Sequence, residues 1–219
     1  MNAINIPYLQ DLNNRDAQIA SKILSAEKEY HVINNVNWPV KFPYCPESKF
    51  VIARSNSALY LKFQIKETNI RALYINDQEP VWEDSCVEFF CKKPQSETYM
   101  NFEFNCIGTC VATTRKGRDV DVVPFSENQM KQIERFSSLY RQLFYEKEGL
   151  SYWELTVKIP FEILGIDPNE LQDNLLGNFY KCADGTSTPH YVSWNPILKT
   201  TPDFHCPEFF GELRFNATT

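Results

Sequence analysis

One short segment places a tryptophan close to an isolated carboxylate. In "PVWEDSCVEFF", Trp82 precedes Glu88 by six residues, and Glu88 lies among large apolar neighbours. Because side chains alternate along a strand, Glu88 points to the face opposite Val87 and Phe89. A single carboxylate in these surroundings indicates either a ligand-binding group or one half of a structural ion pair.

A second segment, "YMNFEFNC", alternates between apolar and polar side chains. One of its faces carries Met100, Phe102 and Phe104 and suits a protein core. The opposite face carries side chains that combine hydrogen-bond donors and acceptors, namely Tyr99, Asn101, Glu103 and Asn105. Such a face could bind the hydroxyl groups of a sugar, and an ordinary solvated sheet face is the alternative.

An arginine could join the two segments into one site. If the strands are neighbours, Glu88 shares a face with Glu103 and Asn105. Arg115, at the end of "GTCVATTR", could then neutralise one of the two glutamates. A carboxylate–arginine pair leaves acceptors free for a ligand. A purely structural ion pair is again the alternative.

The four tryptophans divide into two groups. Trp82 and Trp194 adjoin loop residues in "EPVWED" and "SWNPILK", which is typical of binding surfaces, and packing in the core is the alternative for each. Trp38 and Trp153 are predicted to be structural, and Trp153 lies within a strand patterned for the core.

Composition limits the classes of function. The chain has 219 residues and a net charge of −6, which argues against nucleic-acid binding because phosphate contacts need a basic surface. No apolar run approaches the ~18 residues of a membrane span. No signal peptide is recognisable, so the chain as it stands is expected to be cytoplasmic.

The seven cysteines have no regular spacing and form no CxxC motif. This pattern predicts neither a disulfide framework nor a zinc ribbon. We expect reduced cysteines that pack as small apolar side chains.

Repeated alternation predicts the fold class. "ALYLKFQIKE" and "LSYWELTVKIP" are strand patterns, and short strands between turn residues are typical of an all-β antiparallel sandwich of the jelly-roll or immunoglobulin-like kind. The expected core comprises Phe63, Phe102, Phe104, Leu155 and Val157. A single domain over residues 1–219 is predicted, with an extension at 1–33 and the sandwich at 34–215.

One or two short helices should interrupt the strands. Ser126 and Gln129 have the spacing of a capping box. Pro160 begins a segment that looks like one helical turn ended by Gly165. Residues 13–29 have weaker helical character.

Several of these motifs occur in an order that resembles family 9 carbohydrate-binding modules, the DOMON-like group. They are "VWEDSCVEFF", "YMNFEFNCIGT", "VKIPFEILG", "NFYKC", "HYVSWNPI" and "PDFHCPEFFGELRF". The similarity covers residues 34 to 215 and is that of a stand-alone bacterial member. It implies a β-sandwich that binds mono- or oligosaccharides without cleaving them. Related modules are usually secreted or located at the cell surface.

The resemblance also implies roles for particular residues. Two tryptophans of the family clamp a terminal sugar, while a carboxylate, an arginine and amides bind its hydroxyls. Trp82 matches the first tryptophan and Glu88 the carboxylate. Trp194 is taken as the second tryptophan, Arg115 as the arginine and Asn105 as an amide. The candidate carbohydrate-binding residues are thus Trp82, Trp194, Glu88, Arg115, Asn105 and Glu103.

Two other functions remain open at this stage. A glycoside hydrolase would use Glu88 and Glu103 as its carboxylate pair. A haem-binding redox domain, suggested by distant DOMON relatives, would need axial ligands. The candidates for these are Met100, His31, His190 and His205.

No cofactor is expected, although some members of the family bind calcium. The oxygens of Asp119 and Asp121, or of the pair Glu83–Asp84, could serve as ligands. Neither set has the spacing of an EF-hand loop.

Overall fold

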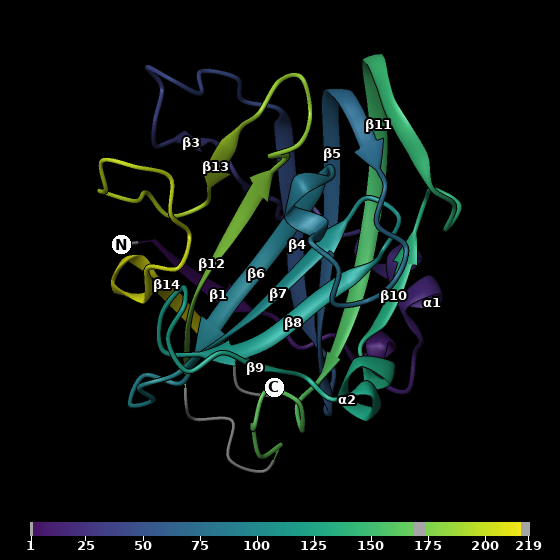
Figure 1. Ribbon diagram of the computed structural model, residues 1–219. Helices are drawn as coiled ribbons and strands as arrows, with labels where there is room; N and C mark the ends of the chain where they lie inside the picture. Colours follow the sequence, from purple (N-terminus) through teal and green to yellow (C-terminus); the bar gives the residue numbers. More distant parts are fainter. Residues whose placement is uncertain (1, 169–173, 216–219) are drawn as a thin grey trace.

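Two sheets packed face to face account for most of the chain (Figure 1). The computed structural model describes residues 2–168 and 174–215. Within these residues the larger sheet has nine strands, and β13 joins its main path through β12 and carries β3. Its strands are, in spatial order, β1 (Ala3–Ile6), β14 (Gly211–Phe215), β12 (Leu175–Cys182), β6 (Cys86–Lys92), β7 (Tyr99–Asn105), β8 (Cys110–Arg115) and β9 (Val123–Pro124), with β13 (Tyr191–Ser193) and β3 (Asn35–Val36) at the side.

The smaller sheet lies behind the larger one in Figure 1. Its neighbouring strands are antiparallel, as are those of the larger sheet except for the parallel pair β1 and β14. In spatial order they are β10 (Glu134–Ser137), β11 (Phe144–Pro160), β5 (Ala58–Ala72), β4 (Glu47–Arg54) and β2 (His31–Val32). The predicted antiparallel sandwich is therefore confirmed.

The core between the sheets consists of inward-facing side chains from both layers. All five residues predicted for it, Phe63, Phe102, Phe104, Leu155 and Val157, are fully buried. Phe179 of β12 stacks on Phe50 of β4 and on Phe89 of β6, with ring centroids 3.9 Å and 4.9 Å away. Alternating apolar residues thus join the two sheets through direct ring contacts.

Short helices occupy the edges of the sandwich. The helix predicted from the capping box is α2 (Glu127–Gln132), and both hydrogen bonds of that box are present. The predicted turn from Pro160 ends at Gly165, which has a positive φ of 64°. The remaining helices are η1 (Gln10–Leu12), α1 (Ala17–Leu24), η2 (Val81–Glu83) and η3 (Pro207–Phe209). No helix among the described residues is both long and apolar enough to cross a membrane.

The N-terminal segment is built into the sandwich. Strand β1 pairs with β14, and β2 pairs with β4, so the boundary predicted at residue 33 does not coincide with an edge of the fold. Helix α1 covers the outer face of the smaller sheet. Lys62 is consequently buried, with its Nζ 2.8 Å from the Glu154 carboxylate and 2.6 Å from the Ser25 hydroxyl.

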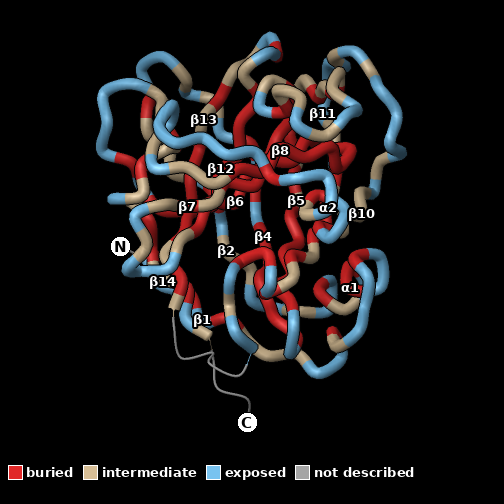
Figure 2. The backbone as a smooth tube through the Cα atoms, turned by 60° about the horizontal axis from the view of Figure 1, so that its bottom comes forward, coloured by how far each residue is buried: buried red, intermediate tan, exposed pale blue. Residues whose placement is uncertain are grey.

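The outer face of the larger sheet is also covered. Alternation directs Glu88 and Phe90 of β6 away from the core, where loops pack over them. Phe90, Tyr180 and Phe204 belong to a second apolar cluster on this side. Figure 2 shows the buried backbone along β6 and β12. Loop cover therefore explains how Glu88 can lie on the outer face and be only 3% exposed.

A buried ion pair connects the two sheets at one end of the core. Glu67 of β5 lies 2.8 Å from the ammonium of Lys181 on β12, and both side chains are fully buried. Trp153 Nε1 donates a 2.7 Å hydrogen bond to the same carboxylate. Lys181 Nζ is also 2.9 Å from His190 Nε2. These contacts satisfy charges that would be costly to bury alone.

Replacing Glu67 with Gln should strongly destabilise the protein, because Lys181 would keep a buried charge without its counter-ion. We expect the free energy of unfolding to fall by about 3–5 kcal/mol, measured by urea denaturation. Glu47→Gln is a matched control, since the Glu47–Lys66 pair is exposed on the surface. That control should cost at most about 1 kcal/mol. Equal losses in both variants would contradict the prediction.

Candidate functional site

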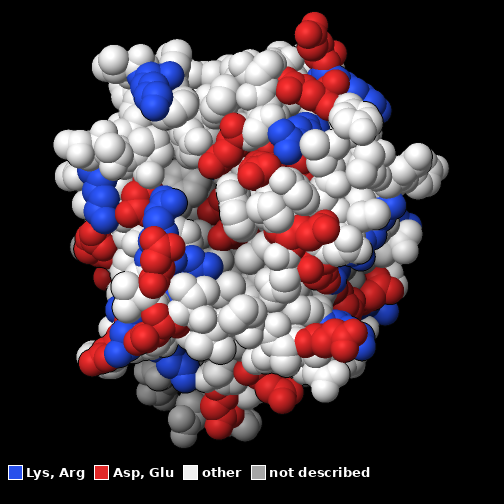
Figure 3. Space-filling model, viewed as in Figure 1, with Lys and Arg blue, Asp and Glu red and all other residues white. Residues whose placement is uncertain are grey.

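A pocket of about 420 Å³ lies on the covered outer face of the larger sheet. This volume falls in the range of ~300–1,000 Å³ typical of small-molecule sites. Glu88, Glu103, Cys182 and Arg115 line it from the sheet, and connecting segments form its walls. On the face shown in Figure 3, acidic and basic side chains border a hollow.

Two opposed carboxylates form the floor. Glu88 of β6 and Glu103 of β7 are direct partners across the two strands, and they are 3% and 4% exposed. Burial, and then the neighbouring Glu103 carboxylate, raise the pKa of Glu88 well above its usual value. Burial also raises the pKa of Glu103 to about 7, against the lowering effect of Arg115 and of a hydrogen bond from Asn101. The floor therefore holds protons near neutral pH.

A chain of hydrogen bonds links Arg115 to Glu103. Arg115 Nε donates to the Thr113 hydroxyl at 2.8 Å, and this hydroxyl donates to Asn101 Oδ1. Asn101 Nδ2 then donates to Glu103 Oε1 at 2.8 Å. Each donor along the chain is thereby oriented by the next residue. Glu88, Glu103 and Arg115, which were expected to share one face, all line the same pocket.

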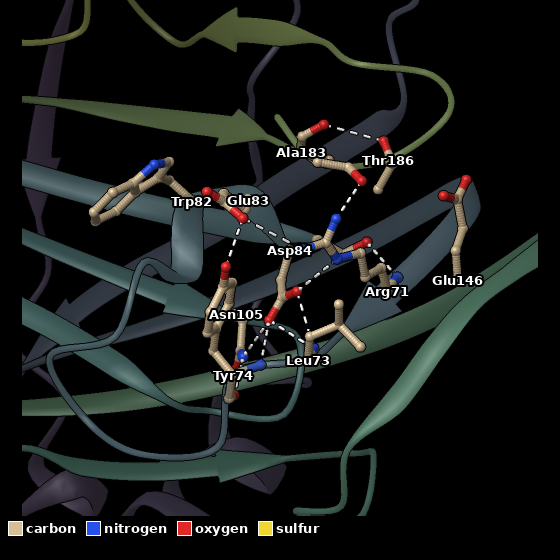
Figure 4. A network of polar contacts seen from close by, with 12 residues as sticks. Arg71, Leu73, Tyr74, Trp82, Glu83, Asp84, Asn105, Glu146, Ala183 and Thr186 are labelled. Atoms are coloured by element: carbon tan, nitrogen blue, oxygen red, sulfur yellow. Dashed lines mark hydrogen bonds and ion pairs between the residues drawn. The ribbon is translucent and has the colours of Figure 1, made fainter.

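Trp82 forms one wall, and the residue is 39% exposed. It lies on η2, whose position is fixed by the buried carboxylate of Asp84 (Figure 4). Asp84 accepts backbone hydrogen bonds from Leu73 at 3.0 Å and Tyr74 at 3.1 Å. It also lies 3.2 Å from Arg71 Nε. The backbone that carries Trp82 is thus held in place by the hydrogen bonds and the ion pair of Asp84.

The segment after β12 is tied to the same wall. The backbone N–H of Asp184 donates to the Trp82 carbonyl at 3.0 Å, and that of Gly185 donates to the Glu83 carbonyl at 2.9 Å. A side chain at Gly185 would approach Glu83 O to 2.9 Å, so this close contact requires glycine. Asp184 lines the pocket, and burial raises its pKa to about 6.

Aromatic and charged residues from the C-terminal part complete the pocket. Phe204 lies parallel to Tyr180, with ring centroids 4.2 Å apart, and Tyr191 meets Phe204 edge-on. His205 Nδ1 is 2.9 Å from the Tyr99 hydroxyl. Burial, followed by the charges of Arg115 and Arg118, lowers the pKa of His205 to about 3. His205 is therefore neutral at physiological pH.

Arg118 and Asp203 close the same side as an ion pair 3.0 Å long. Sequence reasoning missed these two residues and also Asp184, Tyr191 and Phe204. Arg118, Asp184, Asp203 and Phe204 lie in connections between strands, and Tyr191 begins the three-residue strand β13, which is too short for a periodic pattern to report the direction of a side chain. The motif "PDFHCPEFFGELRF" contains Asp203 and Phe204 and was the available signal, but it carried no assignment of roles.

Trp194 does not lie at the pocket, which corrects the clamp inferred from the sequence. It is 6% exposed and meets Phe50 and Phe179 edge-on in the core. Its backbone N–H donates to the Phe179 carbonyl at 2.8 Å, which turns the ring inwards just after β13. Gly211 leaves room for the indole, since a Cβ there would lie 2.6 Å from it.

Asn105 is likewise not among the residues that line the pocket. Its Nδ2 donates to the Tyr74 carbonyl at 2.8 Å and to Asp84 at 3.0 Å. Asn105 therefore supports the segment that carries Trp82 (Figure 4). Its contribution to the pocket is positional.

The residues considered for calcium and haem have separate partners. Asp84 and Glu83 are paired with Arg71, and Asp121 is paired with Lys116, while Asp119 lines the pocket. His31 packs on Phe50, His190 contacts Lys181, and His205 contacts Tyr99. Met100 is half-buried and packs at the edge of the main core.

The raised pKa of Glu103 predicts how stability depends on pH. Its ordinary value is 4.5 and its value in the fold is about 7. Between these limits the folded state binds more protons than the unfolded state, so the free energy of unfolding should fall as pH rises. Glu103→Gln should flatten this decline in urea denaturation at several pH values. The exposed variant Glu47→Gln should keep the original slope, and an unchanged slope in Glu103→Gln would refute the assignment.

Comparison with known proteins gives the pocket a family context. Residues 17–215 match the model of carbohydrate-binding family 9. A crystal structure of a candidate carbohydrate-binding protein from Bacteroides uniformis ATCC 8492 is 32% identical, with a TM-score of 0.90, and the match covers 98% of this chain and 99% of that one. No curated protein sequence matches the chain.

Two further solved structures share the fold at 11% identity. Both are family 9 carbohydrate-binding modules from Caldicellulosiruptor kristjanssonii. The complex with glucose has a TM-score of 0.58 and covers 100% of this chain and 97% of that one. The complex with cellotriose has a TM-score of 0.63 and covers 100% and 95%. Because the family model spans most of its length, the chain belongs to carbohydrate-binding family 9.

Proposed function

We propose that the pocket binds a sugar residue of a mono- or oligosaccharide without cleaving it. The observation that carries this proposal is an exposed indole, Trp82, beside a buried polar floor. A pyranose presents C–H groups on its faces and hydroxyls around its edge. The indole offers an apolar plate for a face, while Glu88 and Glu103 offer oxygens for the hydroxyls.

The polar walls provide orientation and discrimination. Arg115 and Arg118 supply donors, and Asp184 supplies acceptors, around a pocket only a few side chains wide. A sugar that leaves one of these buried groups without a hydrogen bond binds more weakly, because the desolvation cost of that group is not compensated. The pattern of hydroxyls therefore decides which sugar binds. Tyr191 and Phe204 add aromatic surface to the pocket, and we assign to them the role inferred earlier for Trp194.

The geometry of the floor favours binding over hydrolysis. A glycosidase places its two carboxyl groups on either side of the scissile bond. Glu88 and Glu103 instead extend from adjacent strands of one sheet, on the same side of the pocket. The two family 9 modules with bound glucose and cellotriose also support a binding role for this chain.

Trp82→Ala should abolish most of the affinity and leave stability almost unchanged. Loss of the plate should weaken binding about tenfold or more, since burial of an aromatic face is worth ~1–3 kcal/mol. Calorimetric titration with a panel that includes glucose and cellotriose gives the affinity, and thermal melting gives the stability. Trp194→Ala is the matched control, because a core tryptophan should cost about 3–5 kcal/mol of stability. Unchanged affinity in Trp82→Ala would remove the indole from the site.

The non-catalytic part of the proposal has a separate test. Prolonged incubation with cellotriose should release no reducing sugar above the background of the buffer. Turnover that disappears in Glu88→Gln, while the variant still melts like the parent protein, would establish a hydrolase instead. Contaminating activity is excluded if the variant is purified by the same procedure.

A further inference from the structure

Two thiols and a carboxylate lie close together on the larger sheet, and two of these three residues, Glu88 and Cys182, line the pocket. Cys86 on β6 and Cys182 on β12 are direct partners across the antiparallel strands. Glu88 follows Cys86 by two residues and therefore points to the same face. The strand pairing alone brings together three side chains that can bind a metal, and no local motif indicates this because the two cysteines are 96 residues apart.

The donor atoms are already close to one another. Cys182 Sγ lies 3.1 Å from Glu88 Oε1, and the ligand atoms of Cys86, Glu88 and Cys182 all lie within 4.8 Å of one another. In a tetrahedral zinc site, metal–ligand distances of about 2.3 Å for sulfur and 2.1 Å for oxygen place the donors roughly 3.6–3.8 Å apart. Small side-chain rotations would bring the three atoms to that spacing.

The cluster is enclosed and has further charged groups beside it. All three side chains are at most 3% exposed, so water competes little for a bound cation. Glu103 is the direct cross-strand partner of Glu88, and Asp184 lines the same pocket, which also contains the guanidinium groups of Arg115 and Arg118. When a divalent cation binds, its charge balances that of its thiolate and carboxylate ligands.

We propose that Cys86, Glu88 and Cys182 bind a thiophilic divalent cation of the Zn²⁺ or Cd²⁺ class. Two sulfur donors select such metals over Ca²⁺ and Mg²⁺, which prefer oxygen ligands. Glu88 and Cys182 line the pocket, so a cation bound by them could be reached from its interior. Three protein ligands with one open position are typical of zinc sites that bind an exogenous molecule. This inference does not rest on the proposed carbohydrate binding, because the cation has its own measurable signals.

Cadmium chloride is a suitable probe, because cadmium–thiolate bonds absorb in the ultraviolet. Titration of the reduced, metal-free protein should saturate at one cadmium per chain and raise the melting temperature, since the metal binds the folded state. Binding should release protons from the thiols, and the apparent affinity should increase with pH. Calcium chloride should produce neither signal.

Variants identify the ligands. Cys86→Ala and Cys182→Ala should each remove the stoichiometric absorption. Glu88→Gln keeps both thiols and should weaken binding by at least the 10–100-fold seen when only an outer partner of a metal ligand is lost. Cys45→Ala is the control, because Cys45 is an exposed thiol outside the cluster.

Three outcomes would overturn the proposal. They are the absence of absorption at one equivalent of cadmium, its persistence in the double variant Cys86→Ala/Cys182→Ala, and its loss in Cys45→Ala. If a cysteine variant fails to fold, Glu88→Gln still provides the decisive comparison. An affinity for cadmium equal to that of the parent protein would then exclude Glu88 as a ligand and contradict the site.

Discussion

The burial of two opposed carboxylates is the constraint on which the pocket depends. Glu88 and Glu103 face each other across adjacent strands at 3–4% exposure, where two negative charges could not both be accommodated without compensation. Three features provide this compensation. The carboxylates bind protons, a chain of hydrogen bonds connects Glu103 to Arg115, and a loop places Arg118 at the same pocket. A floor that is polar, buried and partly protonated can donate and accept hydrogen bonds, which is what recognition of hydroxyl groups requires.

Alternation within single strands ties this floor to the stability of the sandwich. In β6, Val87 and Phe89 enter the core, while Cys86 and Glu88 point to the opposite face, where Glu88 lines the pocket. A shift of register by one residue would exchange the two sets, so the apolar residues that hold the sheets together also aim the functional ones. The wall of the pocket formed by Trp82 also depends on a buried residue, since Asp84 orders the backbone that carries this tryptophan. Exposure of the indole is therefore compatible with a rigid position.

Local patterns predicted the strands and the side chains that share a face, but not the paths of the connections. The five core residues and the common location of Glu88, Glu103 and Arg115 followed from a period of two. Trp194 was misplaced because its neighbours look like a loop, whereas the pairing of β13 with β12 turns the ring into the core. Tyr191, Phe204 and Arg118 reach the pocket through long-range contacts that no local signal encodes. The burial of Lys62 beneath α1 has the same origin.

Glu88 belongs to both proposed sites, and this sharing has a thermodynamic consequence. When protonated, its carboxyl can donate a hydrogen bond; when ionised, it can accept several hydrogen bonds or bind a cation. A cation at Cys86, Glu88 and Cys182 would fix the ionised form and occupy one of its oxygens, which changes what a sugar finds at the floor. By linkage, any effect of the cation on sugar affinity must equal the effect of the sugar on cation affinity. Competition would arise if both need the same oxygen of Glu88, and cooperation would arise if a sugar hydroxyl fills the fourth position on the metal. Competition and cooperation can be distinguished by substituting Cys86, because this residue contributes to the cation site but does not line the pocket. Its loss would remove a ligand of the cation without removing a residue that faces the sugar.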